Sequence, residues 1–493
     1  MYKLQPSQSD LETLIKNTPN GNIVPVYLEI SADLLTPTAA YLKLSKSSDY
    51  SFLFESVSGN EKIGRFSFLG SNPYHLLKSG EEHEIKGDPL IAVEDYLKQF
   101  NFVEVSNLPS FTGGAIGYVS FDCIKYFEPR TDKKVEDNLK LPESLHMFCD
   151  DLVIFDHLYQ IIKIVTHIKG DIQNPSYLAD QYKIAQSRLE KIADTLVNAP
   201  VELPVQKPIK LGNEYSENCD QERYEGFVRK LQSHIVKGDI IQAVPSRRLA
   251  RPTDLHPFNV YRQLRQVNPA PYLFFLDCKD FQVVGASPEM LVKVDSDRKV
   301  YTHPIAGTRK RGKTEEEDFA LEKDLLSDRK EIAEHTMLVD LGRNDVNRIC
   351  KPTTTKVDSL MHIEKYSHVM HIVSNVSGIL RDDQTPFDAF RSIFPAGTVS
   401  GAPKVKAIEL IRELEGETRG VYAGSVGHFD YSGTIDTCIA IRTMLFKDGV
   451  AYLQAGGGIV HHSNPEDEYH ETVNKLNSNV ATLAKAESYY ANQ

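Results

Sequence analysis

Apolar and polar residues alternate in short runs through the first third of the chain, which predicts strands with one buried face. The runs lie at 51–57, 65–69, 115–121, 152–155 and 160–166. A tight Asp-His turn separates the last two runs. Strands joined by so short a connection pair antiparallel. The chain is therefore predicted to begin with a mainly antiparallel sheet.

Helical periodicity follows at 177–196, and the next stretch carries three prolines, Pro200, Pro204 and Pro208. Proline at this density interrupts regular structure and is typical of a connector. We therefore predict an N-terminal region over 1–197, a connector over 198–212 and a second region over 213–493. Sheet packing is expected to be shared between the two regions.

The second region mixes helical and strand patterns. Helices are predicted at 221–236, 315–341, 404–414 and 465–485. A strand at 436–446, the turn Lys447-Asp448-Gly449 and a strand at 450–454 predict a hairpin. Strands and helices do not alternate as βαβ units, so we predict an α+β fold with antiparallel sheets and helices on the outside.

Composition narrows the classes of function. The chain has 493 residues, of which 41% are hydrophobic, and a formal net charge of -12 from 68 acidic and 56 basic side chains. No long-range positive field therefore attracts nucleic acid or an anionic membrane. An anionic substrate needs a local device such as a metal ion or an arginine.

The first residues, MYKLQPSQSDLETL, have neither the apolar core of a signal peptide nor the arginine-rich pattern of a transit peptide. The sequence also has no uncharged apolar run near the length of a membrane span. We expect a cytoplasmic protein. Its six cysteines are far apart with no CxxC pair, which is typical of reduced structural thiols and argues against a thiolate metal site.

The stretch from Gly307 to Thr314, GTRKRGKT, matches the phosphate-binding pattern GxxxxGK[ST]. Four acidic residues follow at 315–318, and they would repel phosphate from the start of the predicted helix. Thr314 and Glu317 also fit a capping box, which gives the threonine a local role. A P-loop nucleotide hydrolase is therefore a disfavoured alternative.

Two pairs of glutamates lie on predicted helices. Glu331 and Glu334 continue a stripe that ends in Leu338 and Leu341, and Glu468 and Glu471 lie on the last helix. One such pair alone is usually a solvated surface feature. If the two pairs converge, their chemistry suits Mg²⁺, which binds few protein carboxylates and leaves room for an anionic substrate.

Three further features fit a site for a small anion. The glycines Gly456 to Gly458 offer backbone amides to a carboxylate, although a flexible turn is the simpler interpretation. Arg442 fits a carboxylate clamp, or it faces solvent from a strand. His371 fits a general acid or base, or a core histidine with satisfied hydrogen bonds.

Taken together, these segments resemble the chorismate-utilising enzyme family over almost the whole chain. The marks of the resemblance are GDIIQAVPSRR (238–248), GASPEM (285–290), PIAGTRKRG (304–312), DRKEIAEHTMLVDLGRND (328–345), AGTVSGAPK (396–404), TIDTCIAIRT (434–443), QAGGGIV (454–460) and DEYHETVNK (467–475).

The resemblance implies a chorismate site with Mg²⁺ in the second region. It implies that Glu334 and Glu471 bind the metal, that Glu331 and Glu468 lie behind them, that Glu289 is a general acid, and that His371 assists the elimination of pyruvate. The residues implied to line the substrate pocket are Gly307, Thr308, Thr398, Tyr422, Arg442, Gly456, Gly457, Gly458 and Lys475.

Two positions discriminate between reactions within the family. Members that add water to chorismate, the isochorismate and salicylate synthases, carry a lysine base where this chain has Gln242. Aminodeoxychorismate synthases typically carry a lysine where this chain has Ala306 in PIAGT. The resemblance therefore implies addition of ammonia and elimination to anthranilate, the first committed step of tryptophan biosynthesis, with those other reactions as alternatives.

The resemblance also implies a partner and a feedback inhibitor. The isolated cysteines offer no glutaminase nucleophile, so a separate glutamine amidotransferase subunit is expected to deliver ammonia in a hetero-oligomer. Tryptophan is expected to inhibit, and a catalytically silent tryptophan sensor is the alternative from another class. The residues expected at the tryptophan site are Glu55, Ser56, Pro271, Tyr272, Leu273 and Cys438.

Overall fold

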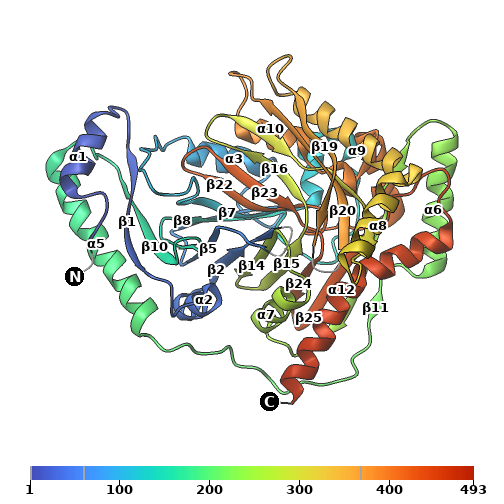
Figure 1. Cartoon of the computed structure of the whole chain (residues 1–493), viewed down its shortest axis with the longest axis horizontal. Coiled ribbons are helices and arrows are strands. Elements are labelled where there is room, and N and C mark those ends of the chain that lie inside the picture. Colours follow the sequence, from blue (N-terminus) through green and yellow to red (C-terminus); the bar gives the residue numbers. More distant parts are fainter. Residues whose placement is uncertain (1–2, 59–61, 367–368, 493) are drawn as a thin grey trace.

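Two large antiparallel sheets form the centre of the protein in a computed structural model that describes residues 3–58, 62–366 and 369–492 (Figure 1). The eleven strands of the first sheet are, in spatial order, β1 (Ile23–Ser31), β10 (Ile161–Lys169), β9 (Leu152–Asp156), β5 (Phe66–Ser71), β2 (Tyr50–Glu55), β14 (Tyr272–Cys278), β15 (Phe281–Ser287), β24 (Thr443–Lys447), β25 (Val450–Gly456), β13 (Ser246–Pro252) and β11 (Ser216–Glu217).

The second sheet has ten strands. They are β18 (Ile305–Lys310), β20 (Val369–Ile379), β17 (Lys299–Thr302), β16 (Met290–Val294), β23 (Ile435–Ile439), β22 (Ser425–Asp430), β7 (Gly114–Val119), β8 (Ser144–Cys149) and β6 (His75–Ser79), with β19 (Lys356–Lys365) beside β20. The sheets and the surrounding helices confirm the predicted α+β class.

Alternation along the strands explains why the sheets stack. In β7, Ile116 and Tyr118 belong to the core shared with the eleven-stranded sheet, whereas Ala115 and Val119 pack into a second core. That second core includes side chains of α3 (Pro89–Leu97) and α10 (Pro386–Ile393). Successive side chains of a strand point to opposite faces, so one sheet packs on a sheet and on helices at once.

Both sheets contain strands from before and after the connector. In the eleven-stranded sheet, β2 pairs with β14, and in the ten-stranded sheet, β7 pairs with β22. No helix or strand interrupts the path from α5 (Pro175–Asn198) to β11 among the described residues, and Figure 1 shows it running below the sheets. The proposed boundaries at 198–212 stay a prediction.

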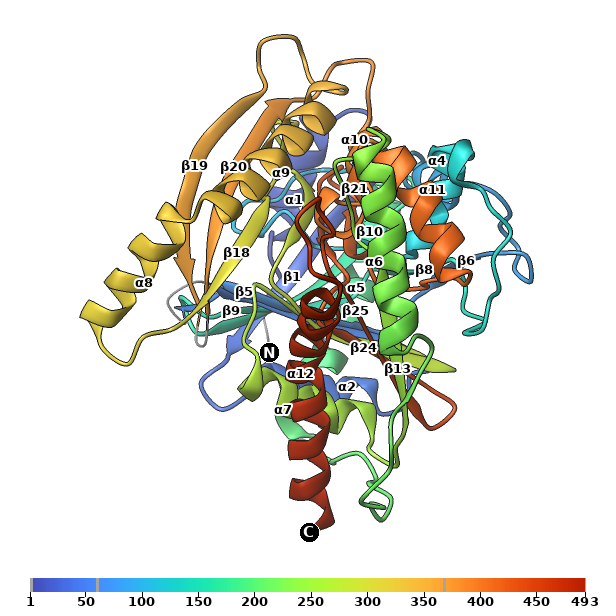
Figure 2. The same ribbon diagram turned by 90° about the vertical axis from the view of Figure 1, so that its right-hand side faces the viewer.

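Helices surround the sheets. α2 (Pro37–Ser45), α5, α7 (Pro257–Val267) and α12 (Pro465–Ala491) contact the eleven-stranded sheet, and α8 (Glu315–Ser327) and α9 (Arg329–Asn347) contact the ten-stranded one. Figure 2 shows α12 beside α6 (Gln221–Val236), which it contacts. The predicted helices at 177–196, 221–236, 404–414 and 465–485 are confirmed as α5, α6, α11 (Lys404–Glu415) and α12.

Two elements that were predicted to be continuous are each divided into two, so these predictions were wrong. The helix predicted at 315–341 is two helices, because the Asp328 side chain accepts hydrogen bonds from the amides of Lys330 (3.0 Å) and Glu331 (3.3 Å) and caps a new helix. The strand predicted at 436–446 is β23 and β24, which lie in different sheets. Arg442 lies between them with a φ of 53°, where the chain passes from one sheet to the other.

In the described part of the chain, no helix combines the length and apolar character that a membrane span requires. All six cysteines are buried and unbridged, as predicted for reduced structural thiols.

Candidate functional site

The two glutamate pairs lie on α9 and α12, and the charge of Glu471 on α12 acts on both glutamates of α9. Burial raises the pKa of Glu331 and of Glu334, and repulsion from neighbouring carboxylates, Glu471 among them, raises both further. Burial likewise raises the pKa of Glu468 to about 7, and Glu471 adds to this shift. Glu471 is therefore close enough to disfavour the charge of Glu331 and Glu334 on the other helix and of Glu468 on its own.

Gln242 joins the first pair to the glycine segment that precedes α12. Its Nε2 donates to Glu334 Oε1 at 3.1 Å. A Cβ added at Gly458 would overlap Gln242 Nε2 and lie 3.4 Å from Glu334 Oε1, so a side chain there would push the Gln242 amide away from its present position. Gln242 is buried in the strand β12 (Gln242–Ala243), which pairs with β21 (Gly401–Ala402).

Glu468 is held on one side only. Ser463 Oγ donates to Glu468 Oε1 at 2.6 Å, whereas Glu468 Oε2 is buried without a hydrogen-bond partner among the described residues. A Cβ added at Gly457 would lie 3.1 Å from that oxygen. A buried polar atom without a partner is rare and calls for a ligand, water or ion.

These donors are carboxylate oxygens, which are ligands that suit Mg²⁺. Among the described residues, no three His, Cys, Asp or Glu side chains converge as a ready-made metal site. Mg²⁺ instead uses one or two carboxylates and completes its shell with water and substrate oxygens. The unpartnered Glu468 oxygen and the four oxygen-bearing side chains are compatible with that mode of binding.

Two basic side chains, Lys475 and Arg442, lie next to the carboxylates. Lys475 Nζ is 2.6 Å from Glu471 Oε1 and donates to the Gly456 carbonyl at 3.0 Å. Burial would raise the pKa of Glu471, but the charge of Lys475 and its hydrogen bond lower it overall. Arg442 Nη1 donates to the Lys475 carbonyl at 3.4 Å, and burial lowers the pKa of this arginine.

Tyr422 and the glycine segment complete this side of the site. A Cβ added at Gly456 would lie 3.2 Å from Tyr422 Oη. The Gly457 amide is used within the protein, because it donates to the Pro245 carbonyl (3.3 Å) and to Tyr224 Oη (3.2 Å).

Glu289 is a buried carboxyl group in the turn between β15 and β16. Burial raises its pKa to about 8, against an ordinary value of 4.5, although the hydroxyl of Thr398 and the amide of Ile305 donate to it and Lys475 attracts it. Thr398 Oγ1 lies 3.0 Å from Glu289 Oε1. At neutral pH this side chain is therefore mostly protonated and able to donate a proton.

His371 lies on β20, next to the irregular part of the neighbouring strand β18. Its Nδ1 is 2.8 Å from the Gly307 carbonyl and 3.2 Å from Thr308 Oγ1. Burial lowers the pKa of His371, so the ring is neutral at neutral pH. A neutral ring that donates from Nδ1 to a carbonyl leaves Nε2 as an acceptor.

The stretch 307–314 does not form a phosphate-binding loop. Its strand, β18, lies in an antiparallel sheet, and the Gly312 amide donates to the Asp318 carboxylate at 2.6 Å. Thr314 caps α8 as predicted, but Glu317 accepts from the Lys313 amide instead of the Thr314 amide, so the capping box is only half formed. A nucleotide would have to displace these acidic partners.

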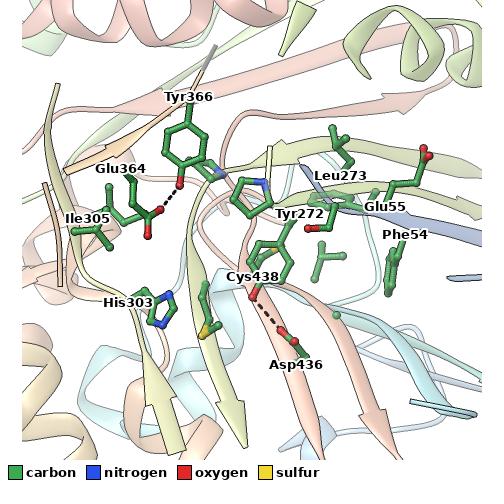
Figure 3. Close-up of a pocket in the computed structure, with 18 of the residues that line it drawn as sticks. Phe54, Glu55, Tyr272, Leu273, His303, Ile305, Glu364, Tyr366, Asp436 and Cys438 are labelled. Carbon is green, nitrogen blue, oxygen red and sulfur yellow. Dashed lines mark hydrogen bonds between the residues drawn. The ribbon is translucent and has the colours of Figure 1, made fainter. Parts of the chain in front are cut away.

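All six residues expected at the tryptophan site line one cavity of about 820 Å³ between the sheets. β2 and β14 pair there with Glu55 opposite Leu273, and Cys438 comes from β23 (Figure 3). The Glu55 carboxylate is bound by α7. It accepts hydrogen bonds from Tyr261 Oη at 2.6 Å and from Arg265 Nη2 at 2.8 Å.

The sequence reasoning missed residues in both places. Tyr224 on α6 and Ser463 hold the glycine segment and Glu468, and only the position of Ser463 just before a helix cap hinted at a polar role. In the cavity, His303, Glu364 and Tyr366 were also missed, and Tyr366 Oη donates to Glu364 Oε2 at 2.7 Å (Figure 3). No motif in the sequence marked these three residues.

Known proteins are similar to this sequence over its whole length. A probable anthranilate synthase component 1 of Schizosaccharomyces pombe is 53% identical over 492 residues, which cover 100% of this chain and 99% of that protein. Anthranilate synthase component 1 of Saccharomyces cerevisiae is 52% identical over 499 residues, which cover 99% of this chain and 98% of that protein.

Solved structures share the fold. The crystal structure of anthranilate synthase component I from Streptococcus pneumoniae is 37% identical, with a TM-score of 0.75 over 91% of this chain and 98% of that one. The menaquinone-specific isochorismate synthase of Escherichia coli, at 17% identity and a TM-score of 0.69 over 96% and 99% of the two chains, is alike in fold alone. A family model described as chorismate binding enzyme matches residues 49–481. The chain therefore belongs to the chorismate binding enzymes.

Proposed function

We propose that this enzyme converts chorismate and ammonia into anthranilate, pyruvate and water, as the first committed step of tryptophan biosynthesis. Full-length relatives at 53% and 52% identity carry the name anthranilate synthase component 1. The observation that carries the proposal is Glu289, a buried carboxyl with a pKa raised to about 8 in a site that contains two cations and four further carboxylates. A neutral carboxylic acid is what the loss of a hydroxyl group as water requires.

The roles of the other residues follow from their charge. Arg442 and Lys475 supply fixed positive charge for a carboxylate of chorismate, and Tyr422 and Gly456 border the same space. Glu334 and Glu471 would hold Mg²⁺, with Glu331 and Glu468 behind them, and the bound ion would supply charge for the substrate's second carboxylate. Gly307, Thr308 and His371, on β18 and β20, are proposed to line the pocket, where His371 accepts a proton as pyruvate leaves.

The choice of nucleophile rests on Gln242. Its amide donates to Glu334 and has no group that accepts a proton from water at neutral pH. Ammonia is itself a nucleophile and needs no such base. We therefore favour amination over hydration, and Ala306 favours elimination over release of the aminated intermediate.

The partner and the inhibitor are part of the proposal. A glutamine amidotransferase subunit is proposed to supply ammonia in a cytoplasmic hetero-oligomer. Tryptophan is proposed to bind the cavity lined by Ser56, Tyr272 and Cys438, whose apolar walls and nearby carboxylates Glu364 and Asp436 suit an aromatic amine.

The test is to incubate the purified chain with chorismate, Mg²⁺ and excess ammonium at mildly alkaline pH and to identify the products by fluorescence and mass. Anthranilate and pyruvate in equal amounts are expected, with no product when glutamine replaces ammonium. Isochorismate, salicylate or an aminodeoxychorismate would overturn the assignment of Gln242 and Ala306. The absence of any product would favour a silent tryptophan sensor.

A further inference from the structure

Arg419 is a buried arginine in the turn between α11 and β22. It is 2% exposed. Its Nε and Nη2 donate to the two carboxylate oxygens of Glu415 at 2.9 and 2.7 Å. A buried guanidinium is tolerated when a carboxylate faces it in this two-pronged geometry, and the geometry fixes its plane.

The remaining donors of Arg419 hold the backbone of two segments that carry site residues. Nη1 donates to the Val399 carbonyl at 2.9 Å, directly after Thr398, whose hydroxyl donates to Glu289. Nη2 donates to the Val244 carbonyl at 2.7 Å, two residues after Gln242. The planar guanidinium thus fixes the distance between two backbone segments. One includes Thr398, which contacts Glu289, and the other includes Gln242, which contacts Glu334.

Glu415 extends the same contacts to the glycine segment. Its Oε1 accepts from the amide and the hydroxyl of Ser246 at 2.7 and 2.9 Å. Ser246 Oγ in turn accepts from Gln454 Nε2 at 2.9 Å, two residues before Gly456. The Arg419 guanidinium also lies 5.6 Å from the ring centre of Tyr422.

We propose that Arg419 and Glu415 form a positioning pair for the reaction, which holds Thr398 against Glu289 and fixes Gln242, Tyr422 and the glycine segment in register. This inference rests on the proposed function for its kinetic test. Neither residue touches the reacting atoms. Their effect passes through the backbone of the four segments that converge on them.

The first test is Arg419→Lys, which keeps the charge but loses the planar fork that reaches two carbonyls and a carboxylate. We expect kcat to fall about 10- to 100-fold, with the KM for chorismate within about 3-fold, because small displacements of reacting groups cost rate. The matched control is Arg251→Lys, since Arg251 forms another largely buried arginine–glutamate pair, with Glu487 at 2.6 Å between β13 and α12. The control should keep its kcat.

A pH profile separates positioning from a general loss of structure. The Thr398 hydroxyl lowers the pKa of Glu289, so losing that hydrogen bond raises the pKa and moves the alkaline fall of kcat to higher pH. Arg419→Lys and Thr398→Val should shift this limb in the same direction, and the double variant should match Thr398→Val alone. Lys475, which also faces Glu289, and Tyr366 are unchanged in all of these variants.

Crystal structures of the two arginine variants provide a test that needs no turnover. The Thr398 to Glu289 hydrogen bond should be lost in Arg419→Lys and kept in Arg251→Lys. An unmoved segment 397–400 with an unshifted pH limb would overturn the inference, whatever product the wild type makes. If Arg419→Lys does not fold, Ser246→Ala removes the hydroxyl between Glu415 and Gln454, and it should lower kcat several-fold while an unchanged kcat would count against the pair.

Discussion

Glu289 combines two properties that usually exclude each other, a carboxyl group and a protonated state near neutral pH. Its pKa is about 8 because burial outweighs the donors of Thr398 and Ile305 and the charge of Lys475. A carboxylic acid kept neutral by an apolar site can donate a proton that an exposed glutamate would already have lost.

Replacing Glu289 with Gln removes the transferable proton and keeps the shape. We expect kcat to fall about 10²- to 10⁴-fold, the usual worth of a general acid. In the wild type, kcat should fall as the pH rises through about 8, since the proposed role of Glu289 requires its protonated form. Steady-state pyruvate release from pH 6 to 9 measures both effects, and a wild-type profile flat to pH 9 would contradict the assignment.

The same substitution should stabilise the fold. The folded pKa of Glu289 lies above its ordinary value of 4.5, so the folded state holds the proton more tightly and stability falls as pH rises from about 4.5 to 8. Glu289→Gln escapes this loss. Thermal unfolding should give the variant a Tm advantage that is absent near pH 4.5 and grows toward pH 8. An advantage that shrinks with rising pH would refute the raised pKa.

Glu334 is the carboxylate that contacts both Gln242 and the glycine segment. Glu334→Gln should raise the Mg²⁺ concentration for half-maximal rate on the order of 10- to 100-fold, because a metal site loses affinity with each ligand or supporting group removed. Titration of a chelator-treated enzyme measures this. Asp340→Asn on the same helix, with its side chain exposed, should leave the Mg²⁺ dependence unchanged. Equal dependence in both variants would exclude Glu334 from the metal site.

The N-terminal caps of α8 and α9 can be compared, because only α9 carries proposed site residues. Asp328 begins the helix that carries Glu331 and Glu334, and Thr314 begins the neighbouring helix. Asp328→Ala and Thr314→Ala should each lower the free energy of unfolding by about 1 kcal/mol. Asp328→Ala alone should also lower kcat, by about 10-fold, because it frees the turn that places the glutamates.

Denaturant midpoints and kcat, measured on both variants, separate the two effects. Equal losses of kcat would mean that the start of α9 has no special role.

The same break shows what local patterns predict and what they miss. Periodicity predicted the helices 221–236 and 465–485 well, because their apolar stripes are continuous and their caps lie next to them. Across Asp328 the periodicity also continues, and only the hydrogen bonds of the aspartate reveal the break. The exit of the chain at Arg442 into a second sheet likewise depends on pairing with distant strands.

The candidate site followed the same division. Residues within motifs, such as Glu289, Glu334 and Glu471, were named from the sequence, and the structure places them in one region. Tyr224 and Arg419 bind backbone atoms of segments far away in sequence, and no local spacing encodes such contacts. Ser463 lies near Glu468 in sequence, but no motif marked their hydrogen bond. The sequence alone also did not show that Glu55 is bound by α7.

At the scale of the whole molecule, the cavity of about 820 Å³ lies where the two sheets meet. Ser56 follows β2 of one sheet, and Cys438 lies on β23 of the other. A ligand there contacts both sheets and stabilises their relative placement by binding the folded state alone. The cavity wall also includes Pro288, Met290 and Ile305, which flank or donate to Glu289.

Ser56→Phe should therefore fill part of this cavity and raise the tryptophan concentration for half inhibition by more than about 10-fold, equivalent to about 1.4 kcal/mol of binding. The proposed binding of tryptophan should raise the Tm of the wild type, and this increase should be smaller in the variant. Ser110→Phe, in a separate cavity of about 790 Å³ near Phe387 and Tyr431, is the matched control and should leave inhibition unchanged. Full inhibition of Ser56→Phe at the wild-type tryptophan concentration would place the inhibitor elsewhere, since a ligand between the sheets cannot share its space with the new ring.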